Sequence, residues 1–252
     1  MESIIQDIVA AKSVAFTVDK EASKLQCKKI AKSMKQSNAM AAVIPQGQFH
    51  IANPDRKCVL ATSIIKYFEK SIAEIVRFAK RIPGFTDLPM DDQANLIRGA
   101  RIECDFISGI VIDPDSMITM SEDGEWFTPE DIATIFTIDF WMEHAKMSRK
   151  IDQMKMTREE VAILKALTVF SPDRCIISET SKVSNIQDTL LRCLNYQVSK
   201  SYKRPAVRLG QLFALLTSLR SITDAGTKEL RKMFIEFPSM TKGSIAEEVM
   251  DE

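Results

Sequence analysis

Apolar residues recur at steps of three or four along most of this chain, which is the spacing of one face of an α-helix. The longest such pattern runs from 56 to 81, with Leu60, Ile64, Phe68 and Ile72 on one face. "MITM" at 117–120 instead lies between Asp-Pro and Asp-Gly turns and favours a short hairpin. The pattern therefore predicts one all-α domain of ten or so helices with a small β element. Further helices are expected over about 3–16, 19–37, 89–112, 128–151, 157–170, 178–200 and 204–237.

The composition excludes several classes of function. Lys plus Arg and Asp plus Glu both number 34, so the net charge is zero and does not favour a nucleic-acid surface. The five cysteines form no C-x-x-C pair, which argues against a zinc ribbon or a disulfide framework. His50 and His144 have no neighbours at metal-ligand spacing, so no metal is expected. No apolar run is long enough to cross a bilayer, and no membrane association is expected.

Two adjacent carboxylates, Asp91 and Asp92, raise the question of catalysis. They follow Pro89 by two and three residues, and proline favours the first turn of a helix. Acidic side chains there complement the positive end of the helix dipole. An acid–base pair would need partners in a cleft, and none lies close in sequence. The pair is therefore interpreted as a helix start.

The stretch "AKRIPGFTDLPMDDQ" at 79–93 joins the end of a helix, a Pro-Gly-Phe turn, Leu88 and Asp-Asp-Gln before a Leu-rich helix. This whole stretch resembles the signature of nuclear receptor ligand-binding domains. "SPDR" at 171–174, "RLGQLFALLTSLRSI" at 208–222 and "IAEEVM" at 245–250 resemble the turn before the ninth helix, the dimer segment and the activation helix of that family. The "SPDR" turn and the Pro-Gly-Phe stretch favour its vitamin D, ecdysone and nematode steroid receptor branch. The signature residues here are Ala79, Lys80, Pro83, Gly84, Phe85, Leu88, Asp91, Asp92, Gln93, Leu96 and Ile97.

The resemblance implies a three-layer antiparallel helical sandwich of about 10–12 helices with a small β-hairpin. It implies a single ligand-binding domain over 1–252 that lacks the family's DNA-binding domain, so that DNA is reached only through the absent domain. The implied function is that of a ligand-activated transcription factor in the nucleus. The ligand would be small and lipophilic, sterol-like or a fatty acid, with no cofactor, no metal and no catalysis.

The resemblance also assigns a wall to the ligand pocket. Arg101 and Asp105 depart from the family pattern, and they are four residues apart, so they can pair on one helix face. Arg101 could instead face an acidic group of the ligand, because arginine binds carboxylates bidentately. The expected ligand-binding residues are Ile64, Tyr67, Phe68, Ser71, Arg101, Cys104, Asp105 and Ser108.

Two protein partners are implied. A coactivator peptide of the Leu-x-x-Leu-Leu type would bind at Val76, Lys80, Phe85, Ile97, Arg98 and Glu248. Lys80 would bind the C-terminal carbonyls of the peptide helix, and Glu248 its N-terminal N–H groups. A heterodimer partner of the retinoid X receptor type would bind at Glu103, Arg174, Arg208, Leu212, Leu215 and Leu219.

Two other functions compete with this interpretation. An orphan receptor domain would act as a ligand-independent interaction module, with its pocket filled by side chains such as Tyr67 and Phe68. An all-α hydrolase would need a nucleophile, and the sequence has neither a G-x-S-x-G elbow nor a recognisable Ser/His/Asp arrangement.

Overall fold

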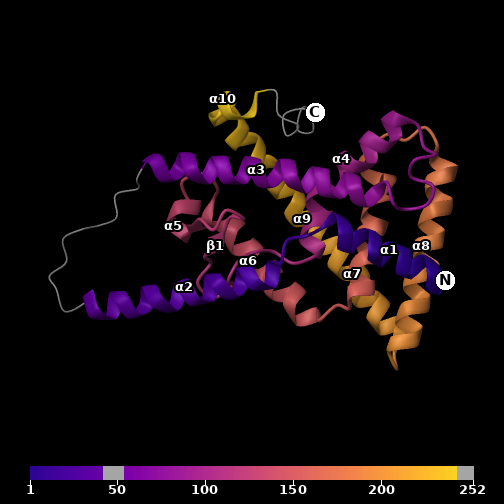
Figure 1. Cartoon of the computed structure of the whole chain (residues 1–252), viewed down its shortest axis with the longest axis horizontal. Coiled ribbons are helices and arrows are strands. Elements are labelled where there is room, and N and C mark those ends of the chain that lie inside the picture. The colour runs from indigo at the N-terminus through magenta and orange to yellow at the C-terminus, as the bar shows by residue number, and fades with distance from the viewer. Residues whose placement is uncertain (42–53, 243–252) are drawn as a thin grey trace. The chain divides into compact units, whose positions relative to one another are not determined.

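The computed structural model describes residues 1–41 and 54–242, which are mostly helical (Figure 1). The two strands, β1 (Thr119–Met120) and β2 (Trp126–Phe127), pair antiparallel as a small hairpin. The predicted all-α class with one hairpin is therefore confirmed. The helices are α1 (Glu2–Ala15), α2 (Lys20–Ala41), α3 (Pro54–Ala79), α4 (Met90–Ile107), α5 (Pro129–Ile132), α6 (Ile138–Met154), α7 (Arg158–Val169), the 3-10 turn η1 (Pro172–Arg174), α8 (Thr180–Ser201), α9 (Pro205–Glu236) and α10 (Pro238–Thr241).

The contacts divide the chain into two compact units. Unit 1 comprises 1–17, 70–109 and 151–223, and unit 2 comprises 18–69, 110–150 and 224–252. Each unit is assembled from three separated stretches, and α3 and α9 contribute residues to both. Whether 1–252 behaves as the single domain predicted from the sequence stays a prediction.

Unit 1 is built around α7, which packs against α1, α4 and α8. The helix begins at a capping box, in which the Thr157 hydroxyl accepts from the Glu160 N–H and the Glu160 carboxylate accepts from the Thr157 N–H. All of its residues from Ala162 to Val169 are buried, and all but Lys165 and Thr168 are apolar. An all-round apolar helix of this kind belongs at the centre of a core.

The Pro-Gly turn after α3 requires its glycine. Gly84 has φ +89°, a conformation that side chains rarely adopt, and a Cβ there would lie 2.7 Å from Ile186 Cδ1 of α8. The turn places Phe85 in the core, where its ring meets Phe170 edge-on at 6.0 Å. The signature stretch thus contributes to the core packing of unit 1.

Unit 2 holds the hairpin against α2. Cys27 and Ala31 of α2 form an apolar cluster with Ile118, with Met120 and Trp126 of the hairpin packed against it. The Trp141 indole N–H donates to the Met117 carbonyl at 2.9 Å and so fixes α6 to the segment before β1. The hairpin is therefore anchored on two sides within this unit.

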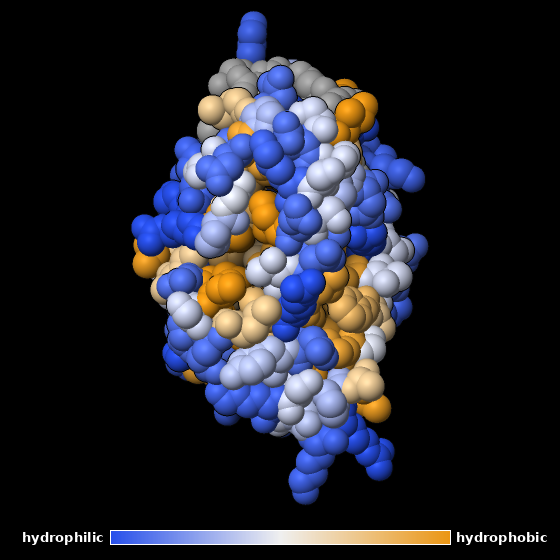
Figure 2. Space-filling model, turned by 90° about the vertical axis from the view of Figure 1, so that its right-hand side faces the viewer, coloured by the Kyte–Doolittle hydropathy of each residue, from blue (hydrophilic) through white to orange (hydrophobic). Residues whose placement is uncertain are grey.

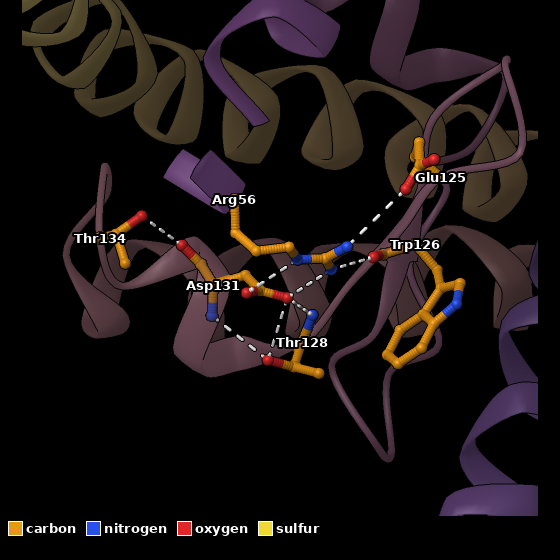
Figure 3. Close-up of polar contacts among 6 residues, drawn as sticks. All are labelled: Arg56, Glu125, Trp126, Thr128, Asp131 and Thr134. Carbon is orange, nitrogen blue, oxygen red and sulfur yellow. Dashed lines mark hydrogen bonds and ion pairs between the residues drawn. The ribbon is translucent and has the colours of Figure 1, made fainter. Parts of the chain in front are cut away.

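Arg56, near the start of α3, ties the hairpin and α5 together (Figure 3). Its guanidinium donates to the Trp126 carbonyl at 2.6 Å and to both carboxylate oxygens of Asp131, at 2.8 and 3.4 Å. Burial alone would raise the pKa of Asp131, but the hydrogen bonds from Arg56 and Thr128 bring it below its usual value. Glu125 adds a fourth contact at 3.7 Å.

One predicted helix is divided. The sequence predicts a continuous helix over 128–151, whereas α5 ends at Ile132 and α6 begins at Ile138. The Glu229 carboxylate of α9 accepts a hydrogen bond from the Thr137 N–H at 3.2 Å. A residue far along the chain thus satisfies a backbone N–H at the start of α6. Sequence periodicity continues across the break and gives no sign of it.

Figure 2 shows the side of the molecule where α8 and the start of α1 lie in Figure 1. Hydrophilic side chains dominate this face, and apolar ones reach the surface in separate patches. The Glu2 carboxylate of α1 accepts hydrogen bonds from the Tyr196 hydroxyl and the Lys200 ammonium group of α8, at 3.0 Å each. Among residues 1–41 and 54–242, no helix has the length and apolar composition needed to cross a membrane.

Candidate functional site

Asp91 and Asp92 do lie in the first turn of α4, as predicted. Asp92 does more than begin its own helix. Its carboxylate accepts from the N–H and hydroxyl of Ser178 and from the Glu179 N–H, each at 2.9 Å, at the start of α8. These bonds hold the pKa of the Asp92 carboxyl below its usual value, with the Ser178 N–H as the largest cause. Asp92 is therefore a link between two helix starts and not half of an acid–base pair.

In unit 1 the predicted ligand residues gather on the second half of α4. Cys104 and Asp105 are buried, and Arg101 is half-buried with its guanidinium donating to the Arg98 carbonyl. Ser71 of α3 is also buried. The two roles considered for Arg101, pairing with Asp105 and binding an acidic ligand group, both stay predictions.

Ser108 stands out in this group because its hydroxyl oxygen is buried and makes no hydrogen bond within the described part of the chain. It directly follows the last residue of α4, and its backbone N–H is satisfied by the Asp105 carbonyl at 3.3 Å. A buried hydroxyl without a partner costs about 1–3 kcal/mol relative to a satisfied one. This oxygen is therefore positioned to accept or donate a hydrogen bond to a bound molecule.

The remaining predicted ligand residues belong to unit 2. Tyr67 accepts a hydrogen bond from Lys20 at 3.4 Å, and Ile64 is half-buried. Phe68 meets Phe234 of α9 edge-on, with ring centroids 6.2 Å apart. This contact joins α3 to α9 within unit 2.

The predicted coactivator residues of unit 1 differ in how exposed their side chains are. Lys80 is exposed one residue after α3, with no ion-pair partner in 1–41 and 54–242. Val76 and Arg98 are half-buried, and Arg98 donates to the Asn95 side chain at 2.9 Å. Ile97 is buried. Glu248 lies outside the described residues.

Phe85 does not fit the predicted role in peptide binding. Only 1% of its surface is exposed, because the Pro-Gly turn directs the ring onto Phe170 in the core. A side chain so deeply buried cannot contact a partner unless the turn opens. We therefore reassign Phe85 to the core of unit 1.

The predicted dimer residues of α9 also need correction. Leu212, Leu215 and Leu219 are fully buried within the chain, so they form core and not a surface. Arg208 is buried as well, with its guanidinium on both carboxylate oxygens of Glu160 at 2.6 and 2.7 Å. Both partners are buried, so this ion pair is structural, and its hydrogen bonds raise the pKa of Arg208.

Glu103 faces inward too. It is buried, and the Thr223 hydroxyl of α9 lies 3.5 Å from its carboxylate. The backbone of Arg174 belongs to η1, but its side chain lies outside what the structure describes, so the predicted Glu103–Arg174 contact stays a prediction. In the first part of α9, up to Thr217, the exposed residues are other, uncharged ones, among them Val207, Gly210, Phe213, Ala214 and Thr217.

His144 is a structural residue of α6. Its Nδ1 lies 3.1 Å from the Phe140 carbonyl, and its ring stacks on Trp141. Burial lowers the pKa of His144 to about 4. No group of three or more metal-binding side chains occurs in the described ranges, and His50 lies outside them.

Sequence reasoning missed the buried position of Lys165. Lys165 of α7 is fully buried, donates to the Cys104 carbonyl of α4 and lies 3.6 Å from the centre of the Phe16 ring. The only sign in the sequence is a lysine inside the apolar run "VAILKALTVF". It joins α7 to the helix that carries the predicted ligand residues.

Comparison with known proteins gives a consistent result. Residues 53–235 match the ligand-binding domain of nuclear hormone receptor. Nuclear receptor subfamily 1 group D member 2 of Rattus norvegicus is 28% identical over 164 residues, 65% of this chain and 28% of that protein. The steroid hormone receptor ERR2 of Mus musculus is 27% identical over 198 residues, 73% of this chain and 45% of that protein.

The vitamin D3 receptor of Coturnix japonica is 29% identical over 172 residues, which are 64% of this chain and 37% of that receptor. The matched part thus spans less than half the length of each of these relatives. The family match covers most of the chain and agrees with the helical sandwich and small hairpin expected from the signature. The chain therefore belongs to the nuclear hormone receptor family, as its ligand-binding domain, and not to an enzyme family.

Proposed function

We propose that this chain binds a small lipophilic ligand, sterol-like or a fatty acid, and that the ligand controls recruitment of Leu-x-x-Leu-Leu coactivators in the nucleus. The observation that carries the ligand proposal is the buried hydroxyl of Ser108, which has no hydrogen bond in the described ranges. Ser108 directly follows α4, the helix that carries the buried residues Cys104 and Asp105. Apolar walls with a few unsatisfied polar groups are typical of small-molecule sites.

Native mass spectrometry of the chain purified without denaturants tests this proposal. We expect a retained lipid, and we expect Ser108→Ala to weaken rebinding of a hydroxylated lipid by roughly two- to tenfold, the value of one hydrogen bond. The same lipid without its hydroxyl group serves as the control, because its affinity should be unchanged by the substitution. Equal losses for both lipids would remove Ser108 from the site.

A second candidate function is that of an orphan domain whose pocket is filled by its own side chains. It is favoured by the edge-on contact of Phe68 with Phe234 and by the hydrogen bond that holds Tyr67 to Lys20. Aromatic pairs of this geometry contribute about 0.5–1.5 kcal/mol beyond their burial. If no lipid is retained and none binds, this candidate replaces the first.

Coactivator binding is proposed through Lys80 and Glu248. Lys80 is exposed at the end of α3 and is not held by an acidic neighbour in the described part of the chain, so its ammonium group can reach the carbonyls at the end of a peptide helix. This is the terminus that favours a cation. Phe85 takes no part in this proposal.

Lys80→Ala and Glu248→Ala should each weaken binding of a Leu-x-x-Leu-Leu peptide by roughly tenfold or more, because a hydrogen bond to a charged group is worth about 1.5–3 kcal/mol. Fluorescence polarisation with a labelled peptide measures the effect. Arg81→Ala is the matched control, since Arg81 is an exposed cation next to Lys80. Unchanged affinity in both variants, or an equal loss in the control, would contradict the two roles.

Heterodimer formation is proposed through the outer face of α9. Val207 and Phe213 are 55% and 40% exposed on an uncharged stretch, and exposed aromatic and branched residues are typical of interface cores. Buried Leu212, Leu215 and Leu219 would support that face from below. Sedimentation with a retinoid X receptor domain tests whether such a complex forms.

A further inference from the structure

The zero net charge of the chain conceals an uneven distribution. Helix α2 contains six lysines and one glutamate, so it carries five positive charges in excess. The rest of the chain must then carry five negative ones, because the totals are equal. Five excess positive charges on one helix give its surface a local positive potential, which the overall composition of the chain does not reveal.

The fold of unit 2 determines which lysines face outward. Cys27 and Ala31 of α2 are packed on the hairpin cluster. Lys20 and Lys24 are engaged near the start of the helix, with Tyr67 at 3.4 Å and Glu21 at 3.6 Å. The opposite face carries four exposed lysines that have no ion-pair partner in the described ranges, namely Lys28, Lys29, Lys32 and Lys35.

Two acidic side chains of the neighbouring hairpin loop are engaged by other cations. Asp123 lies 3.4 Å from Lys66, and Glu125 lies 3.7 Å from Arg56, so both are engaged by cations of α3. Between Glu21 and Asp55 the sequence has no acidic residue. The four lysines therefore form an exposed cationic surface.

We propose that this surface of α2 binds the phosphate backbone of double-stranded DNA without reading its sequence. At about 1.5 Å per residue, Lys28 and Lys35 are roughly 10 Å apart along the helix. Each DNA strand carries one phosphate per roughly 3.4 Å of its axis, so four lysines over that length approach the charge spacing of one strand. Lysine acts as a point charge, which suits phosphate contact and not base reading.

Other polyanions fit the surface less well. A protein partner would need an apolar or aromatic core, and lysine is depleted in such interfaces. A membrane-surface helix needs a free apolar face, but that face of α2 is occupied by the hairpin. Among the described side chains of α2, Leu25 is the one large apolar side chain that is exposed.

The experiment is a salt titration of binding to a labelled duplex of about 20 base pairs and scrambled sequence, measured by fluorescence anisotropy on the 252-residue chain. Four phosphate contacts predict a slope of log K against log salt of about −3.6, which is a loss of about a hundredfold between 50 and 200 mM salt. A slope near zero, or no binding at 50 mM salt, would overturn the proposal.

Variants then locate the contact. Replacement of all four lysines by glutamine, a good helix former, should bring the slope close to zero, and replacement by arginine should preserve it. Circular dichroism checks that α2 still folds. The charge-matched control replaces four exposed lysines elsewhere by glutamine, namely Lys146, Lys182, Lys203 and Lys228.

The control should retain most of the parent slope, because its changes lie outside α2. An equal loss in the control would mean that only total charge matters, which contradicts a site on α2. Binding to vesicles that contain an anionic lipid, together with no binding to the duplex, would assign the surface to a membrane and also overturn the proposal.

Discussion

Arg208→Met is expected to lower the free energy of unfolding by about 3–5 kcal/mol, the usual cost of leaving one member of a buried ion pair alone. Glu160 is fully buried, and Arg208 supplies two of its hydrogen bonds. Arg208 also donates to the Met154 carbonyl at 3.1 Å and lies over the Tyr202 ring. Urea denaturation followed by circular dichroism measures the loss.

Arg220→Met is the matched control, because Arg220 lies on the same helix but pairs with Asp173 at the surface. Exposed pairs are worth about 0–1 kcal/mol, so this variant should change stability little. Replacing both Arg208 and Glu160 by leucine should recover much of the loss, since the pair then leaves no charge behind. If Arg208→Met kept full stability and lost only dimerisation, the role predicted from the sequence would be restored.

Phe85→Ala is expected to cost about 3–5 kcal/mol of stability, as for other large aromatic side chains removed from a core. The ring is 1% exposed and packs edge-on against Phe170. Phe213→Ala provides the comparison, because that ring is 40% exposed on α9 and its removal leaves no cavity. Thermal and denaturant unfolding of both variants decide the matter.

The opposite outcome is equally informative. If Phe85→Ala had the stability of the parent and lost only affinity for the coactivator peptide, the turn after α3 would have to open on binding. Phe85 would then return to the peptide site. A loss of both stability and binding is the expected result, because the turn positions Lys80 as well.

Helix positions could be predicted from the sequence because apolar spacing reports burial directly. The capping box at Thr157 was also recognisable in the sequence, because its two residues lie only three positions apart. The break between α5 and α6 was not, because the group that satisfies the start of α6 is Glu229, 92 residues after Thr137. Contacts between distant elements leave no local pattern.

The candidate site shows the same limit. An apolar stretch such as 208–222 indicates that a helix is buried, but it does not tell which of its faces meets a partner. Leu212 and Phe213 are neighbours, yet one is fully buried and the other 40% exposed. The role of Asp92 likewise depends on Ser178 and Glu179, which the fold alone brings to it.

The packing of the hairpin has a practical consequence for spectroscopy. The chain has two tryptophans, Trp126 in β2 and Trp141 in α6, and both belong to unit 2. Indole emission therefore reports the environment of that unit, whereas far-ultraviolet dichroism averages over the helices of both. Coincident midpoints from the two probes would mean that the units melt together, as one domain should. Separate midpoints would reveal an intermediate in which the hairpin has lost its packing while α7 and its neighbours remain folded.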